Sequence, residues 1–160
     1  MHKKSIVHRD IKFMNIFCCD STDFPKVKVG DLGLAIKLAE GKKVVQKVGT
    51  TAFTAPEVLK EEPYDFKADV WSLGIICYTL IATTLPFATS KPDPKLTQLI
   101  TKKDISFEQP IWSTISGECK DLIFKMLTKD KHARISMAEV TQHPWMLKDK
   151  TQLDQVRAFG

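Results

Sequence analysis

The stretch that most constrains the fold is residues 69–81, Asp-Val-Trp-Ser-Leu-Gly-Ile-Ile-Cys-Tyr-Thr-Leu-Ile. It has the length of a helix, and apolar side chains lie on nearly all of its faces. A helix that is apolar all round has to be buried, so we expect it at the centre of the core. Asp69, at its start, can accept hydrogen bonds from free backbone amides. The longest apolar run, 73–85, is too short and too polar to span a bilayer.

The rest of the pattern predicts a mainly α protein with a short β-hairpin. We expect three further helices at 95–101, 118–128 and 136–142, separated by proline and polar breaks. Strands are expected at 16–19 and 26–30, on either side of a turn at 20–25. The basic stretch 34–48 lacks strong periodicity and is interpreted as a mobile loop. With 160 residues, of which 43% are hydrophobic, the chain fits one domain with a fair core.

Residues 8–15, His-Arg-Asp-Ile-Lys-Phe-Met-Asn, form a polar loop that leads into the first of these strands. An aspartate such as Asp10 can accept a proton from a hydroxyl group. Lys12 can neutralise a phosphoryl group, and Asn15 can bind a metal ion. Asp31 follows the second strand directly, and Gly33 permits a sharp turn after it. Phosphoryl transfer needs these groups, because its catalysis is mostly positioning and charge stabilisation.

Several motifs together resemble those of protein kinases. Residues 8–15 match H-R-D-x-x-x-x-N, and residues 31–33 read D-L-G where kinases carry D-F-G. Residues 55–57 read A-P-E, residues 69–74 match D-x-W-S-x-G, residues 130–134 match D-x-x-x-R, and residues 143–145 read H-P-W. The motifs occur in family order, so the chain resembles the C-terminal lobe of a Ser/Thr protein kinase.

Finer features point to a subgroup. Lys12 favours Ser/Thr over Tyr specificity, since tyrosine kinases usually place arginine or alanine in that loop. Residues 58–59 and 105–107 are most similar to the calmodulin-dependent and calcium-dependent kinase group.

The resemblance implies catalytic and cofactor-binding roles for five residues. Asp10 would orient the substrate hydroxyl and accept its proton, and Lys12 would steady the γ-phosphate of ATP. Asn15 and Asp31 would hold magnesium and thereby the nucleotide. Thr50 would shape the substrate pocket and hydrogen-bond Asp10 and Lys12. The implied cofactors are ATP and Mg²⁺, and the implied activity is transfer of the γ-phosphate to a Ser or Thr hydroxyl of a protein.

The resemblance also implies structural roles. His8 and Leu32 would belong to a packed spine anchored on Asp69, with Leu32 keeping the packing role of the usual phenylalanine. Arg9 is at the position that usually meets a phosphate on the activation loop.

A further structural pair is implied near the end of the matched region. Arg134 would form an ion pair with Glu57.

The motifs that cover ATP in kinases are missing from this sequence. There is no G-x-G-x-x-G before the catalytic loop and no V-A-I-K lysine. Residues 2–7 are interpreted as the tail of the preceding helix. We therefore expect a partial kinase domain over 1–146 that lacks its N-lobe, followed by a tail at 147–160. Such a fragment would expose apolar surface and would be inactive alone.

Smaller departures bear on regulation and substrate. Between Gly33 and Val48 there is no Ser, Thr or Tyr, so Arg9 has no obvious phosphate partner and we expect activation without phosphorylation of this loop. Met14 and Thr79 stand where kinases that prefer basic residues upstream of the target carry acids. A preference for basic substrates is therefore not expected.

Other readings remain beside the enzyme. The chain could be a kinase-like binding lobe that docks partners without catalysis. The net charge of +5 comes from scattered lysines without interleaved aromatics, so neither nucleic acid nor a membrane is an expected partner. Four cysteines without metal-binding spacing, and no signal peptide, favour an intracellular, cytoplasmic protein. The tail carries Leu153, Val156 and Phe159 three apart, as an ordinary terminal helix or as an autoinhibitory or calmodulin-binding helix.

Overall fold

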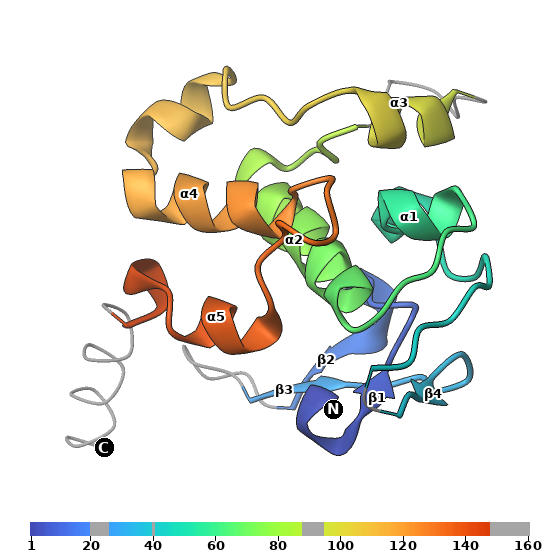
Figure 1. Ribbon diagram of the computed structural model, residues 1–160. Coiled ribbons are helices and arrows are strands. Elements are labelled where there is room, and N and C mark those ends of the chain that lie inside the picture. The colour runs from blue at the N-terminus through green and yellow to red at the C-terminus, as the bar shows by residue number, and fades with distance from the viewer. Residues whose placement is uncertain (20–25, 40, 88–94, 148–160) are drawn as a thin grey trace, which may run out of the picture.

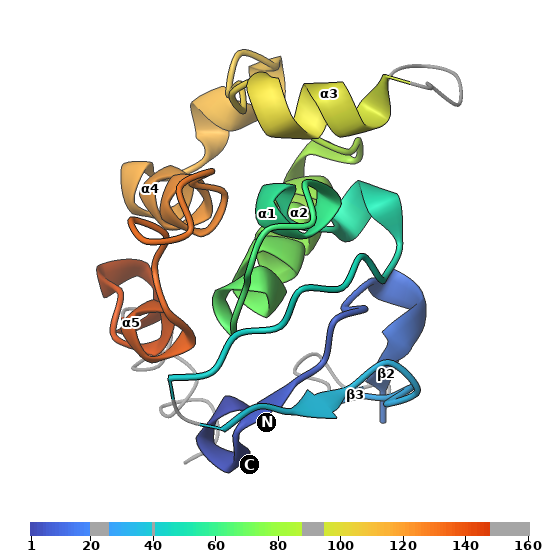
Figure 2. The ribbon, with the colours of Figure 1, turned by 45° about the vertical axis from the view of Figure 1, so that its right-hand side comes forward.

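The computed structural model describes residues 1–19, 26–39, 41–87 and 95–147. The protein is mostly helical with two small β-sheets, and the helices lie to one side of the strands (Figure 1; Figure 2). The α-helices are α1 (Pro56–Leu59), α2 (Lys67–Ala82), α3 (Leu96–Lys102), α4 (Gly117–Met126) and α5 (Met137–Thr141). The strands are β1 (Ile6–Val7), β2 (Ile16–Cys18), β3 (Val27–Val29) and β4 (Ile36–Lys37). Single 3₁₀ turns lie at His2–Lys4, Phe13–Asn15, Thr51–Phe53 and Pro110–Thr114.

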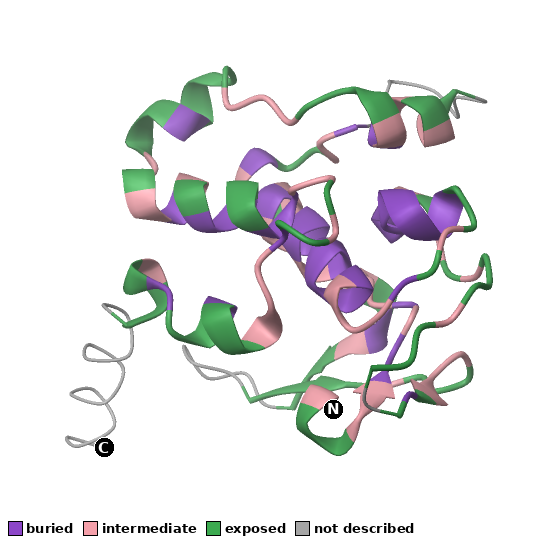
Figure 3. Cartoon of the chain, viewed as in Figure 1, coloured by how far each residue is buried: buried purple, intermediate pink, exposed green. Residues whose placement is uncertain are grey.

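Helix α2 is the central element of the core, which confirms the expectation for residues 69–81. It runs diagonally between the other helices and is buried along most of its length (Figure 3). Val70, Trp71 and Ile75 are completely inaccessible to solvent. The helix begins at Lys67, two residues earlier than expected, where the Asp65 side chain accepts a hydrogen bond from the Lys67 amide at 2.9 Å.

The predicted hairpin is present as β2 and β3. The two strands pair antiparallel, with Ile16 opposite Val29 and Cys18 opposite Val27. The expected turn at 20–25 lies outside the described residues.

A second strand pair, β1 with β4, was not predicted. Val7 pairs with Ile36 inside the stretch 34–48 that was interpreted entirely as a mobile loop. Two residues are too few to display strand periodicity, and the pairing joins positions about thirty residues apart. The interpretation of this stretch as loop alone is therefore wrong.

The C-terminal helices α3, α4 and α5 lie close to their predicted ranges. Local capping explains two of the boundaries. The Ser116 hydroxyl accepts a hydrogen bond from the Cys119 amide, and Ser136 forms a capping box with Glu139. The expected tail at 147–160 falls outside the described residues apart from Leu147.

The N-terminal segment differs from its prediction. Residues 2–7 were expected to be helical, but the structure forms one 3₁₀ turn at His2–Lys4 and then strand β1. Ser5 adopts a left-handed conformation with φ 57°, which ends the turn. The helical interpretation is therefore wrong for Ile6 and Val7.

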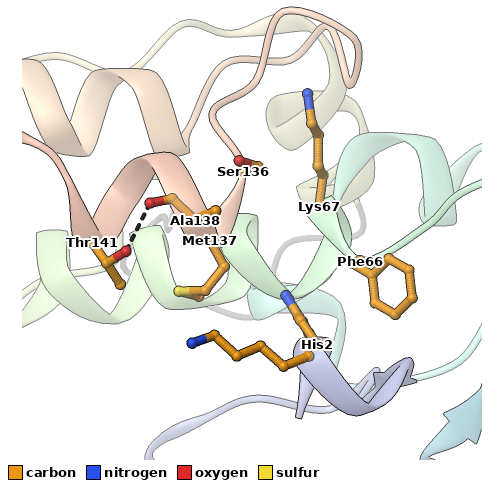
Figure 4. Close-up of a pocket in the computed structure, with 8 residues that line it drawn as sticks. His2, Phe66, Lys67, Ser136, Met137, Ala138 and Thr141 are labelled. Atoms are coloured by element: carbon orange, nitrogen blue, oxygen red, sulfur yellow. Dashed lines mark hydrogen bonds between the residues drawn. The ribbon is translucent and has the colours of Figure 1, made fainter.

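Apolar surface is exposed on the side of the strands, as expected. Phe17 and Val27 on the hairpin are 53% and 55% accessible. A cavity of about 540 Å³ opens between the first 3₁₀ turn, the start of α2 and helix α5, where His2, Phe66 and Met137 line it (Figure 4). Within the described part of the chain, no helix is both long and apolar enough to cross a membrane.

Candidate active site

The polar loop at residues 8–15 is fixed to the core helix by a single buried carboxylate. Asp69 is 1% accessible and accepts hydrogen bonds from the backbone amides of His8 at 2.8 Å and Arg9 at 2.9 Å. The His2 ring nitrogen Nε2 lies 2.8 Å from the same carboxylate. Asp69 thus holds the loop to the start of α2. Removal of this acceptor would leave the amides of the loop without a hydrogen-bond partner.

Asp10 projects from this loop into a cluster of hydrogen-bond donors. Its Oδ1 accepts from the Thr50 backbone amide at 3.0 Å and from the Thr50 hydroxyl at 2.9 Å. Its Oδ2 lies 2.7 Å from the Lys12 ammonium. Burial by itself raises the pKa of Asp10, but the hydrogen bonds and charge of Lys12 and the bonds from Thr50 outweigh it and lower the pKa below its ordinary value. The carboxylate is therefore ionised at neutral pH.

Lys12 and Thr50 complete this cluster. The Lys12 ammonium also donates to the Thr50 hydroxyl at 3.0 Å. Thr50 directly follows Gly49, whose backbone has φ 94°, a conformation that is unfavourable for residues other than glycine. A Cβ at position 49 would lie 2.5 Å from the Arg9 carbonyl oxygen, so the two backbones pass in close contact. Residues forty positions apart in sequence are thereby joined at one carboxylate.

Asn15 and Asp31 come to the same end of the hairpin. Asn15 directly precedes β2, and its backbone oxygen accepts from the amide of Gly30, which precedes Asp31. The Asn15 amide nitrogen donates to the Asp10 carbonyl oxygen at 2.8 Å, which leaves the amide oxygen as the atom available to a cation. Asp31 is exposed, has φ 56°, and accepts a hydrogen bond only from the Gly33 amide among the described residues.

This donor set fits magnesium better than a metal that needs a complete protein cage. In the described part of the chain, no group of three or more His, Cys, Asp or Glu side chains could hold a metal ion. Mg²⁺ is usually held by one or two carboxylates together with phosphate oxygens and water. Asp31 and the Asn15 amide oxygen could contribute to such a partial set.

The two expected spine residues differ in the structure. His8 is completely buried, and its Nε2 lies 3.0 Å from the Gly30 carbonyl oxygen. Leu32 is 58% accessible among the described residues, and its role in a spine stays a prediction. It follows Asp31, whose backbone is in the left-handed region with φ 56°.

Arg134 and Glu57 form a buried, two-pronged ion pair. The Arg134 guanidinium donates to both Glu57 carboxylate oxygens, at 2.6 Å and 2.8 Å. Arg134 is 1% accessible and lies over the Trp71 ring, with 5.0 Å from guanidinium carbon to ring centroid. The pair joins α1, and with it the segment that carries Thr50, to the C-terminal part of the fold.

Two contacts at the site were not predicted from sequence. One is the contact of His2 with Asp69. The other joins Arg9 to Gln46, whose side-chain oxygen accepts from the guanidinium at 2.6 Å. Gln46 lies in the stretch without periodicity, and no sequence signal marked it; His2 carried none either.

The chain matches the protein kinase domain family over residues 1–146. It is 38% identical to the serine/threonine-protein kinase PEPKR2 of Arabidopsis thaliana over 91% of this chain and 30% of that protein. It is 35% identical to smooth-muscle myosin light chain kinase of Gallus gallus over 96% of the chain and 8% of that protein. It is also 39% identical to human ribosomal protein S6 kinase alpha-1, over 98% of the chain and 22% of that protein. The chain therefore spans less than a third of the length of these relatives. The chain belongs to the protein kinase family.

Proposed function

We propose that residues 1–146 act as the C-terminal lobe of a Ser/Thr protein kinase that transfers the ATP γ-phosphate to a protein hydroxyl. The observation that carries this proposal is the Asp10 carboxylate, held at Oδ1 by Thr50 and at Oδ2 by Lys12. A carboxylate fixed by neighbours on both oxygens is oriented before substrate arrives, and positioning is the main contribution of such enzymes.

Each residue of the site has a separate role in the proposed transfer. Asp10 would orient the substrate hydroxyl and accept its proton. Lys12, 2.7 Å from Asp10, would lie where negative charge builds up on the transferred group. Asn15 and Asp31 would hold Mg²⁺, and Mg-ATP supplies the phosphoryl group together with neutralisation of its charge when bound. Thr50 would position both Asp10 and Lys12 beside the substrate pocket.

Substrate class and regulation follow from smaller features. Lys12, and the resemblance to a relative named as a serine/threonine-protein kinase, support hydroxyls of Ser and Thr. Met14 is 62% accessible and apolar, and the Thr79 hydroxyl donates a hydrogen bond to the Ile75 carbonyl oxygen of its own helix. Neither would attract a basic side chain. We also propose that the protein belongs to the calmodulin-dependent and calcium-dependent group. Contact with calmodulin through the tail is part of this proposal.

The proposal is tested by calorimetry of Mg-ATP binding to this chain and to Asp31→Asn. Asp104→Asn is the matched control, because Asp104 is exposed and pairs with Lys129 away from the site. We expect the unchanged chain and the control to bind equally and Asp31→Asn to lose binding. Equal binding by Asp31→Asn, or no binding by the unchanged chain, would contradict the assignment of these residues as a nucleotide site.

A further inference from the structure

The guanidinium of Arg9 is paired with uncharged acceptors. Its Nε donates to the Leu34 carbonyl oxygen at 2.6 Å, and its Nη1 donates to the Gln46 side-chain oxygen at 2.6 Å. Within the described ranges, no carboxylate forms an ion pair with this side chain. The Arg9 backbone has φ 71° and donates its amide to Asp69, so the residue is fixed to the core on its other side.

Gln46 is anchored to the core independently of Arg9. The Tyr64 hydroxyl donates to the Gln46 carbonyl oxygen at 3.0 Å, and Tyr64 is 2% accessible. Two residues earlier, Val44 exchanges a pair of backbone hydrogen bonds with Tyr64, both at 3.0 Å. The segment that carries Gln46 is thus held by Tyr64 on one side and by Arg9 on the other.

The position of Gln46 determines where the chain goes next. Three residues later, Gly49 passes in close contact with the Arg9 carbonyl oxygen. Thr50 then donates its amide and its hydroxyl to Asp10. Only four residues separate the Gln46–Arg9 contact from the Thr50–Asp10 contact, so the chain between them has little freedom. Loss of the Gln46–Arg9 contact would therefore loosen Thr50 and with it the orientation of Asp10.

The sequence gives this contact a particular meaning. Residues 34–48 contain no Ser, Thr or Tyr, so this stretch offers no hydroxyl group that could be phosphorylated. The neutral side-chain amide of Gln46 already accepts a hydrogen bond from the Arg9 guanidinium. We propose that Gln46 is a positioning residue, a built-in latch that holds residues 44–50 on Arg9 and keeps Thr50 on Asp10 without phosphorylation. The consequence for catalysis rests on the proposed function.

The latch is tested on the whole chain by amide hydrogen exchange at Thr50. Gln46→Met keeps the length of the side chain but removes the acceptor, Gln46→Glu keeps an acceptor, and Val45→Ala is the control at an exposed neighbour. We expect exchange at Thr50 to become roughly three- to tenfold faster in Gln46→Met and to stay unchanged in Val45→Ala. Exchange in α2 should be unaffected by any of them.

Rescue and salt dependence distinguish a latch from a general loss of packing. Gln46→Glu should restore slow exchange at low salt through a charge-assisted bond to Arg9, and this protection should weaken as salt rises. The unchanged protein should show little salt dependence, because its acceptor is neutral. Unchanged exchange in Gln46→Met, or fast exchange in Gln46→Glu at low salt, would overturn the proposal.

A second measurement separates the latch from the proposed function. In phosphorylation of a serine peptide by the chain joined to a kinase N-lobe, Gln46→Met should lower kcat with little change in KM for ATP, and Gln46→Glu should restore kcat. Transfer by the unchanged protein with no effect of Gln46→Met on exchange would refute the latch and leave the function standing. The expected exchange pattern without any transfer would refute the function and leave the latch standing.

Discussion

Replacing Arg134 by Met should be among the most destabilising single changes in this chain. Arg134 donates to both oxygens of Glu57 and also to backbone carbonyl oxygens of Lys67, Thr128 and Lys129. Glu57 is 3% accessible, so the change would leave a buried carboxylate without its cation. Breaking a buried pair from one side costs about 3–5 kcal/mol. For a chain of this size that corresponds to a fall in Tm of roughly 6–20 °C.

The assay is thermal and urea-induced unfolding followed by circular dichroism. Lys125→Met is the matched control, because the Lys125–Asp121 pair is equally short at 2.7 Å but half exposed. Its loss should cost less than about 1 kcal/mol. The double variant Glu57→Gln/Arg134→Met should be more stable than Arg134→Met alone, since the uncompensated charge is gone. A cost for Arg134→Met no larger than that for Lys125→Met would refute this reasoning.

Two further predictions concern the site. Lys12→Met removes the hydrogen bond and charge that lower the Asp10 pKa, so the Asp10 pKa should rise. Because this pKa is depressed in the folded state, the ionised carboxylate stabilises the fold above the ordinary carboxyl pKa, and this stabilisation is lost as pH falls through the folded-state pKa. In the variant the loss should therefore occur at higher pH. NMR titration of the Asp10 carboxyl carbon measures this, and an unchanged or lower midpoint would contradict it. Gly49→Ala should destabilise by about 1–3 kcal/mol in urea unfolding, because of its φ of 94° and the approach to the Arg9 carbonyl oxygen. Gly41→Ala, at φ 71° with open space around it, is the control, and an equal cost for both would count against the close contact.

Sequence patterns predicted the elements that contain a long apolar run or are marked by local turn and capping residues. The apolar stretch 69–81 predicted the buried helix α2, and two short strand-like runs at 16–19 and 26–30 on either side of a turn predicted the hairpin. The resemblance to protein kinases implied that Thr50 hydrogen-bonds Asp10 and Lys12, and the structure contains both contacts. The helix and the hairpin depend on signals that lie within a few residues of each other, whereas the contacts of Thr50 came only from the family resemblance.

The features that sequence did not predict depend on contacts between distant segments. The pairing of Val7 with Ile36 comes from two very short strands, for which no local pattern exists. The contact of Gln46 with Arg9 depends on the path of an aperiodic stretch. Exposure of Leu32 depends on which other residues are available to cover it, and a family motif does not record that.

The most direct test of the central claim is transfer of the ATP γ-phosphate to matched serine and tyrosine peptides by residues 1–146 joined to a kinase N-lobe, with and without the substitution Asp10→Asn. Asp104→Asn again serves as the control. The account predicts phosphorylation of the serine peptide only, and a fall of at least about a hundredfold in kcat for Asp10→Asn while the control keeps full activity. Equal activity of Asp10→Asn, or transfer to tyrosine in preference to serine, would contradict it.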